Sequence, residues 1–167
     1  MSANPPHLPE PNADEVDAFW DRYLAAAGLP DDTPFDDVGS FGDTVEMADE
    51  LLELVLTGTK RATASAVAEY ESEQAPMPEV GDEWIACDGA GTPVAVIRTI
   101  EVEVAPLSSV DDEFAFDEGE GDRSREYWLE VHTRFFERTY RALGLDFHAE
   151  ISVVFERFEV VYDEDWA

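Results

Sequence analysis

The chain has 167 residues, of which 40 are Asp or Glu and ten are Lys or Arg, so its formal net charge at pH 7 is −30. Intrinsic disorder is excluded, because it requires few apolar residues as well as high charge, and 44% of this chain is hydrophobic. The length indicates one domain with one core. A compact fold tolerates such a charge where salt shortens the Debye length to roughly 3 Å, at about 1 M. The composition therefore predicts a salt-adapted protein.

Partners and compartment follow from the same composition. Cys87 is the single cysteine, which excludes a disulfide within the chain, and its apolar neighbours predict a small buried side chain. No segment approaches the length of a membrane span, and no apolar run follows a basic N-terminal segment, so we expect no membrane partner and a cytoplasmic location. The global charge opposes nucleic-acid binding, but in a salt-adapted chain only a local basic cluster is informative.

The N-terminal third is expected to begin with an unstructured lead-in over residues 1–11, which hold four prolines. Asn12 is a candidate N-cap for an amphipathic helix that ends at Gly28. Residues 31–41 are acidic and rich in turn residues. We expect residues 12–39 to form a helix and loop packed on a main domain over residues 40–162. The buried stripe of the helix is predicted to be Val16, Phe19, Trp20, Tyr23, Leu24 and Ala27.

The next elements are a helix, a strand and a hairpin. Asp43 or Thr44 can cap a helix that ends at Thr57-Gly58, with Met47, Ala48, Leu51, Leu52 and Val55 as its buried stripe. A strand is predicted from about residue 62 to 70 and a loop over 71–81. Residues 83–87 and 93–104 are predicted to pair as a hairpin. Alternation puts Arg98 on the apolar face of the second arm, where a charge needs a partner or a cavity.

The C-terminal third is expected to contain a short helix within 106–116, an acidic glycine-containing loop over 117–122, a long helix over 123–143 and a closing strand over 150–162. The buried stripe of the long helix is predicted to be Tyr127, Trp128, Val131, Phe135 and Ala142. This order of elements indicates an α+β domain with a mainly antiparallel sheet or small barrel.

Lys60 is the only lysine of the chain, whereas the other nine basic residues are arginines. It follows a helix end, and Thr63 and Ser65 come after it at alternate positions, which share one face of a strand. A cation at a helix C-terminus offsets the macrodipole, but that role does not require Lys in place of Arg. Lys can lose its proton when desolvated, or act as a compact charge on an oxyanion. A neutral amine can also activate a neighbouring hydroxyl.

Further candidates lie in the last third. Glu118 and Glu120 alternate with Gly119 and Gly121, and glycines permit close approach of a backbone or carboxylate to a ligand. His132 is interpreted as a packing residue, and the three histidines lack zinc spacing, so no metal site is predicted. An arginine strip on the long helix is a minority candidate for phosphate contact, since Glu130–Arg134 and Glu137–Arg141 are favourable helical pairs. The strip comprises Arg134, Arg138 and Arg141.

Four blocks of residues in order make the chain similar to the ASCH domain family, which is related in fold to PUA domains. The first is Phe41-Gly42-Asp43 and the second runs from Leu54 to Ser65, including Gly58-Thr59-Lys60-Arg61-Ala62-Thr63. The third is Val80-Gly81-Asp82. The fourth runs from Glu118 to Ser124 and leads to Tyr127, Trp128 and His132. The resemblance covers roughly residues 40–162.

This resemblance implies a PUA-like β-barrel with flanking helices and a pocket at the barrel mouth. The family is associated with RNA, and it includes small amidohydrolases that remove an acyl group from N4-acetylcytidine as well as ribonuclease-like members. By motif, the resemblance implies Thr63 as nucleophile and Lys60 as its base. Glu120, with Glu118 as the alternative, is implied as a second proton-transfer group or as an orienting group. Ligand contacts are expected from Ser65, Arg98, Glu118 and Trp128.

The resemblance leaves the activity open. Ser65 stands where the small amidohydrolases carry an arginine, and the chain is longer than they are. No cofactor is evident, although a divalent cation is expected if the chemistry is ribonuclease-like. The partner is expected to be RNA or a nucleoside-type small molecule. The alternatives to a hydrolase are a non-catalytic RNA-binding module and a nucleotide-sensing module.

Overall fold

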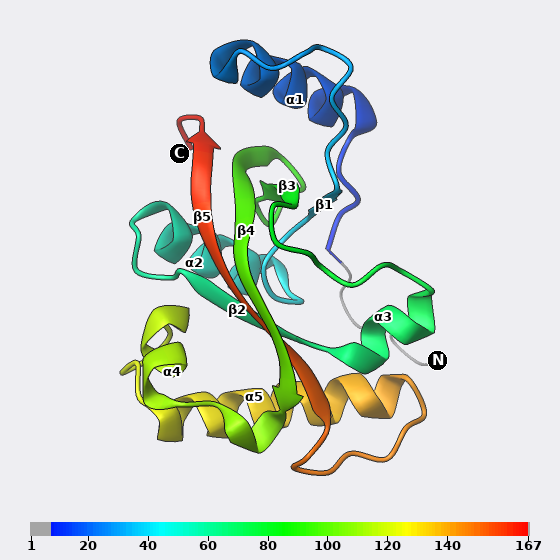
Figure 1. Cartoon of the computed structure of the whole chain (residues 1–167), viewed down its shortest axis with the longest axis vertical. Coiled ribbons are helices and arrows are strands. Elements are labelled where there is room, and N and C mark those ends of the chain that lie inside the picture. Colours follow the sequence, from blue (N-terminus) through cyan, green and yellow to red (C-terminus); the bar gives the residue numbers. More distant parts are fainter. Residues whose placement is uncertain (1–7, 167) are drawn as a thin grey trace. The chain divides into compact units, whose positions relative to one another are not determined.

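A computed structural model describes residues 8–166 of the chain (Figure 1). Five strands form one mixed sheet in the order β1-β3-β4-β5-β2, and helices accompany it. The short strand β1 (Asp37–Gly39) runs parallel to β3 (Glu83–Cys87). The pairs β3–β4 and β2–β5 are antiparallel. The predicted α+β class with a mainly antiparallel sheet and flanking helices is therefore confirmed.

The chain divides into two compact units, and the long strands β4 (Pro93–Pro106) and β5 (Ser152–Asp163) contribute to both. The first unit comprises the described residues up to Gly58, residues 81–98, and the chain from Glu159. Its helices are α1 (Ala13–Ala27) and α2 (Val45–Leu56). Asn12 and Thr44 cap these helices with their side-chain oxygens, and Gly28 ends α1 in the left-handed conformation, as predicted. Of the lead-in predicted over 1–11, residues 1–7 lie outside the described part.

The core of the first unit is formed by the apolar face of α1 packed on β3 and β4. Phe19, Trp20 and Tyr23 of α1 are buried together with Ile85, Cys87 and Val96. Five of the six residues predicted for the α1 stripe are buried, and only Ala27 at the helix end is exposed. Burial raises the pKa of the Cys87 thiol to about 12, which confirms this cysteine as a structural side chain.

The second unit spans residues 59–80 and 99–158 and contains β2 (Ala62–Ala66), α3 (Val67–Glu73), α4 (Asp112–Glu118) and α5 (Arg125–Ala142). A short 3₁₀ turn, Leu107–Ser109, precedes α4. Small residues of β2 pack against aromatic side chains of α4, α5 and β5. The buried members of this core include Ala62, Ala66, Phe114, Trp128, Phe136 and Phe155.

Three predictions about local structure were wrong. The strand expected to reach residue 70 ends at Ala66, because the following acidic residues disfavour a strand and form α3 instead. Strand β1 was not predicted, since three residues leave no readable alternation. The stripe predicted for α5 was one position out of register, with only Trp128 correct. The buried residues are Trp128, His132, Phe136 and Tyr140.

Arg98 also departs from the expected pattern. Val94 and Val96 of β4 are buried, but Ile100 and Val104 on the same alternation are about half exposed, so the apolar face does not continue along the strand. The guanidinium of Arg98 forms ion pairs with Glu83 at 3.5 Å and with Glu159 at 3.2 Å. The predicted need for a partner is thus met within the first unit. In the described part of the chain, no helix is both long and apolar enough to cross a membrane.

Candidate functional site

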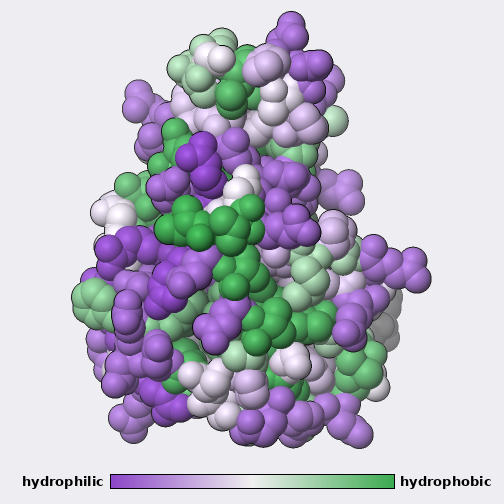
Figure 2. Space-filling model, viewed as in Figure 1, coloured by the Kyte–Doolittle hydropathy of each residue, from purple (hydrophilic) through white to green (hydrophobic). Residues whose placement is uncertain are grey.

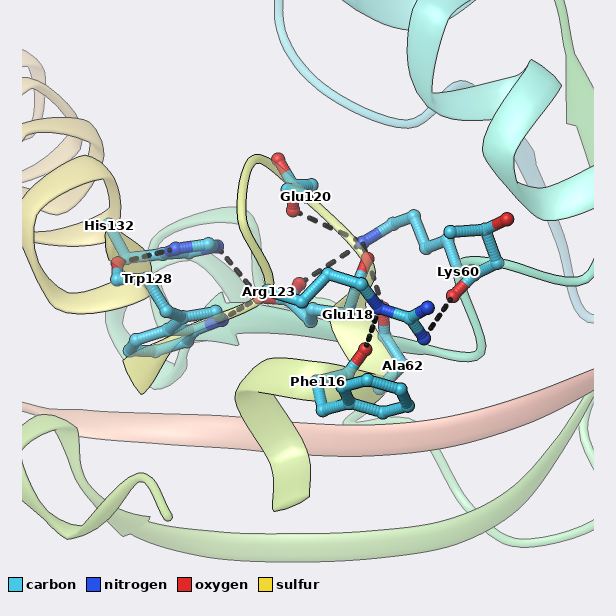
Figure 3. A network of polar contacts seen from close by, with 9 residues as sticks. Lys60, Ala62, Phe116, Glu118, Glu120, Arg123, Trp128 and His132 are labelled. Carbon is cyan, nitrogen blue, oxygen red and sulfur yellow. Dashed lines mark hydrogen bonds and ion pairs between the residues drawn. The ribbon is translucent and has the colours of Figure 1, made fainter. Parts of the chain in front are cut away.

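Lys60 is buried in the second unit, with 2% of its side chain exposed (Figure 3). Its Nζ donates to the backbone carbonyl of Ala62 at 2.8 Å, to Glu118 Oε1 at 3.1 Å and to Glu120 Oε2 at 3.4 Å. A charge removed from water must be paired and hydrogen-bonded, and this ammonium has both kinds of partner. The only lysine of the chain is therefore held in one place by a carbonyl and two carboxylates.

Glu118, the last residue of α4, is the most buried acid of this cluster, with 1% of the residue exposed. Besides Lys60, it accepts hydrogen bonds from the indole Nε1–H of Trp128 and contacts His132 Nε2 at 3.0 Å. Burial by itself would raise the pKa of the Glu118 carboxyl, but the charges and hydrogen bonds of Lys60 and His132 hold that pKa below its usual value. Glu118 is accordingly a buried carboxylate with donors on both oxygens.

His132 lies on the buried face of α5, one turn after Trp128, and its ring stacks on the indole at 3.9 Å between centroids and 11° between planes. Its Nδ1 is 2.9 Å from the Trp128 carbonyl oxygen. Burial acts to lower the pKa of His132, but the neighbouring Glu118 charge outweighs it and the pKa is raised. From the sequence, His132 was interpreted as a packing residue, and its ionic contact with Glu118 was missed. The signal that could have revealed this role is the spacing of four residues from Trp128, which places both side chains on one face of the helix.

Glu120 is the most exposed side chain of the four, at 19% against 2% for Lys60, 2% for Glu118 and 10% for His132. It lies two residues beyond the end of α4, in the loop that leads to α5 (Figure 3). In that view its carboxylate lies above the Lys60 ammonium and Glu118 lies below it. Of the two glutamates that contact Lys60, Glu120 is therefore the better placed to meet a ligand.

The two glycines between these acids permit close packing of the loop. Gly119 has φ +77°, and a Cβ there would lie 2.5 Å from the Thr59 carbonyl oxygen and 3.1 Å from the Lys60 Cα. Gly121 has φ +58°, and a Cβ there would lie 2.3 Å from the Tyr127 ring. Both positions exclude a side chain by conformation and by space. Gly119 thus lets the loop after α4 lie against the backbone that carries Lys60, and Gly121 lets it lie against Tyr127.

Arg123 connects the same loop to the segment that precedes Lys60. It adopts a left-handed backbone with φ +64°, which costs about 1 kcal/mol or more for a residue with a side chain. Its guanidinium donates to the carbonyls of Phe116 at 2.9 Å and Thr59 at 3.3 Å, and lies 3.6 Å from the centre of the Phe116 ring. The loop after α4 and the residue before Lys60 are therefore joined directly.

Asp117 makes a second connection. Its backbone carbonyl accepts from the Arg61 N–H at 2.7 Å, and its carboxylate is shared by the guanidinium groups of Arg61 at 3.0 Å and Arg157 at 3.2 Å. Two arginines on one carboxylate link α4 to the residue after Lys60 and to β5. Neither Arg123 nor Asp117 was predicted as a site residue. Arg123 was noted only as part of the fourth block, and nothing local distinguishes Asp117 among 40 acids.

The remaining predicted residues occupy different places. Thr63 is partly buried on β2, opposite Glu156 of β5 in the strand register. It is on the face of β2 opposite that of Ala62, and Ser65 shares this face. The Ser65 hydroxyl is hydrogen-bonded to the Tyr70 hydroxyl of α3 at 2.8 Å. Arg98 belongs to the other unit, with the partners described above.

Arg134, the first residue of the arginine strip, lies on a solvent-exposed face of α5. Arg134 pairs with Glu130 at 2.8 Å, the helical pair expected from the sequence, and both side chains are more than half exposed. Arg138 lies 5.8 Å from the centre of the Phe135 ring. The three arginines of the strip are therefore exposed at the surface, and none of them is a buried cation like Lys60.

Glu118, Glu120 and His132 could in principle hold a metal, since one ligand atom from each lies within 4.8 Å of the others. However, Lys60 already contacts both carboxylates, and the imidazole of His132 faces acceptors from both ring nitrogens. A divalent ion requires the cation Lys60 to leave and His132 to present a lone pair. The donor set therefore does not fit a metal as it stands.

Fold and cluster together define a small α+β protein with a buried lysine–carboxylate–histidine site beside an edge strand of its sheet. A family model of the ASCH domain matches residues 37–162, and the chain belongs to the ASCH domain family. This confirms the resemblance seen in the sequence, although it leaves the proposed salt adaptation untested. No match was found among curated proteins.

Two solved structures are similar over nearly the whole chain. Protein EF3133 from Enterococcus faecalis is 36% identical, with a TM-score of 0.83 over 90% of this chain and 90% of that one. An ASCH domain from Lactobacillus crispatus is 30% identical, with a TM-score of 0.82 over 89% of this chain and 95% of that one. The similarity extends beyond residues 40–162, because each match covers about nine tenths of this chain.

Proposed function

We propose that this chain is a hydrolase of a nucleoside-type substrate, either free or within RNA, and that it removes an acyl group from a base amine. The observation that carries the proposal is the contact of the buried Lys60 with Glu120, the most exposed member of the cluster. A buried ammonium bonded to a carboxylate that solvent can reach is suited to moving a proton to or from a ligand. Membership of the ASCH family supports a ligand related to RNA.

Thr63 is the proposed nucleophile, three residues after Lys60 on β2. Lys60 passes one proton to Glu120 and, as a free amine, accepts the hydroxyl proton of Thr63. The Thr63 oxygen then bonds to the acyl carbon, and the base amine leaves with the proton that Glu120 held. Water hydrolyses the resulting ester, releasing the acid and restoring the hydroxyl. Glu118 stays ionised and keeps Lys60 in position.

Charge favours an amide over a phosphodiester as the bond that is cut. Two carboxylates contact the single ammonium, so a phosphate approaching Glu120 meets a negative charge, whereas an acylated base is neutral. Phosphoryl chemistry at this site would instead use Lys60 to stabilise the charge of the transition state and Glu120 as the base.

The test is hydrolysis of N4-acetylcytidine, free and within a single-stranded RNA, followed in molar KCl by release of acetate. The variants are Lys60→Ala, Thr63→Val and Glu120→Gln, and Glu126→Gln is the matched control because Glu126 is an exposed acid on α5. We expect loss of turnover by 10²-fold or more in the first three, an order of magnitude typical of proton-transfer groups, and unchanged turnover in the control. Equal turnover of the wild type and Lys60→Ala contradicts the proposal.

A non-catalytic RNA-binding module is the second candidate, and the distribution of cations favours it. Eight of the ten Lys and Arg residues belong to the second unit, with 19 acids, whereas the first unit has two of them with 21 acids. Cleavage of unmodified RNA without acyl hydrolysis would support a phosphodiesterase. Binding of unmodified RNA without either reaction would support a binding module. Binding that weakens with salt and with Arg134→Ala or Arg138→Ala, without product, identifies the module.

A further inference from the structure

His132 is a buried titratable residue to which the proposed reaction assigns no step. It is 8% exposed, yet it is neither a purely apolar packing residue nor a surface histidine. Its two ring nitrogens face different groups, the Trp128 carbonyl oxygen at 2.9 Å and a Glu118 carboxylate oxygen at 3.0 Å (Figure 3). Stacking on Trp128 fixes the plane of the ring. The arrangement constrains where the protons of this network lie.

The identity of the two acceptors determines the protonation of the ring. A backbone carbonyl can only accept, so Nδ1 must carry a proton. Glu118 already accepts from Lys60 on one oxygen and from the Trp128 indole on the other, which is the contact pattern of an ionised carboxylate. Nε2 therefore donates as well. With protons on both nitrogens, His132 is an imidazolium.

The charges of the whole cluster then balance. The groups that face His132 are Glu118 and Glu120 from the end of α4 and its loop, and Lys60 from the segment before β2. Two carboxylates around Lys60 alone would leave one negative charge in excess in a largely buried site. An imidazolium removes that excess. Like charges that share a site otherwise force one carboxyl to take up a proton.

We propose that His132 is a positioning residue of the Lys60 site, which as an imidazolium supplies the second positive charge that lets Glu118 and Glu120 be ionised together. It acts through Glu118 and contacts no substrate. Its consequence for activity rests on the proposed function, since only an ionised Glu120 can accept the proton of Lys60. Its consequence for protonation and stability does not, and both can be measured on the protein alone.

The direct test is nuclear magnetic resonance of the ring nitrogens, in the full chain at constant KCl between pH 6 and pH 8. His148 is the internal control, because it is exposed and its Nδ1 accepts from the Glu150 N–H at 3.2 Å. We expect both nitrogens of His132 to carry a proton at pH 6.5. In Glu118→Gln, which keeps the shape but removes the charge, His132 should lose a proton within the same range. A His132 ring with one unprotonated nitrogen at pH 6.5 in the wild type overturns the proposal.

A double-mutant comparison keeps the test independent of folding losses in one variant. His132→Gln leaves the cluster with one negative charge in excess, and Glu118→Gln leaves it with one positive charge in excess until His132 loses its proton. The double variant is balanced again as Lys60 and Glu120. The single lysine of the chain reports the result, because reductive methylation can modify only Lys60 and the chain's α-amino group. Reductive methylation requires the free amine, so we expect Lys60 to be methylated at least tenfold more slowly in His132→Gln than in the wild type, because the excess carboxylate charge favours the ammonium. The double variant should return to the wild-type rate. Methylation of Lys60 in His132→Gln as fast as in the wild type, or faster, contradicts the charge-balance proposal, and His148→Gln should change nothing.

The activity arm separates this inference from the proposed function. If N4-acetylcytidine is hydrolysed, His132→Gln should move the acid limb of the pH–rate profile to higher pH by about one unit, with a smaller effect on KM than on kcat. If the wild type has no such activity, the proposed function fails, and the nitrogen protonation and methylation results still stand. An unmoved acid limb in an active enzyme overturns the role of His132 while leaving the hydrolase intact.

Discussion

Lys60 Nζ lies 3.1 Å from Glu118 Oε1, and each of these side chains is only 2% exposed. An ion pair so far from water loses hydration that its own attraction does not fully replace, so it persists only where other groups complete its hydrogen bonds. Trp128 and His132 do this for the carboxylate, and Ala62 and Glu120 do it for the ammonium. The burial of the Lys60 ammonium therefore depends on the Glu118 carboxylate, and the burial of that carboxylate depends on Lys60.

Lys60→Met should destabilise the protein by about 3 kcal/mol, because it leaves buried carboxylates without their cation. Urea unfolding at constant KCl measures the change. The double variant Lys60→Met/Glu118→Gln should recover part of the loss. Arg134→Met is the matched control, since its ion pair with Glu130 is exposed and should contribute less than about 1 kcal/mol. A loss no larger than that of the control would show that Lys60 and Glu118 are not coupled in solution.

The stability that His132 and Glu118 provide should depend on pH in two directions. The pKa of His132 is raised in the folded state, so its contribution is complete below the unfolded value of 6.5 and is lost as pH rises through the folded value. The pKa of Glu118 is lowered, so its contribution is complete above the unfolded value of 4.5 and is lost as pH falls through the folded value. Both contributions are complete between pH 4.5 and 6.5.

The measurement is urea unfolding of the wild type and His132→Gln at a series of pH values in 2 M KCl, which screens the general charge repulsion. The difference in unfolding free energy should be largest near pH 6 and shrink above pH 6.5, because the unfolded state then releases the proton that the folded imidazolium retains. A difference that grows with pH would have the wrong sign and would show that His132 is neutral when folded.

Gly119→Ala should be more destabilising than Gly144→Ala. Both glycines have a left-handed backbone, with φ +77° and +71°, but a Cβ at Gly144 meets nothing within 4 Å, whereas one at Gly119 lies 2.5 Å from the Thr59 carbonyl oxygen. The control thus carries conformational strain alone, about 1 kcal/mol. The Gly119 variant adds displacement of the backbone that bears Lys60. Unfolding free energies and the methylation rate of Lys60 measure both effects; equal losses would mean that the close approach is absent.

Salt should stabilise the whole protein. With a net charge of −30, self-repulsion acts against compaction at low ionic strength and is screened at high ionic strength. We expect the thermal midpoint to rise between 0.1 M and 2 M KCl. Urea unfolding in the same series distinguishes the cause, because screening should raise the free energy of unfolding most steeply at the lowest salt. No change across the series would contradict the expectation of salt adaptation.

Much of the local structure could be predicted from residue patterns. Asn12 and Thr44 cap helices because their side chains accept from backbone N–H groups three residues ahead, a relation contained within four residues of sequence. The hairpin of β3 and β4 follows from two apolar runs around a turn. The uniqueness of Lys60, and the glycines at 119 and 121, marked the segments that meet. These are short-range or compositional signals.

The contacts that make the cluster required the tertiary structure. Residues 60 and 118 are far apart in sequence, and among 40 acids nothing local shows that Glu118 would be buried and Glu120 partly exposed. The register of α5 was misjudged for the same reason: apolarity favoured Val131 and Phe135, whereas His132 is buried because Glu118 offers it a charge. The sequence alone determined the helices α1, α2 and α5, the hairpin and the one lysine that matters. Only the fold decided which carboxylates and which histidine surround it, because the burial of a charge depends on partners that distant segments bring.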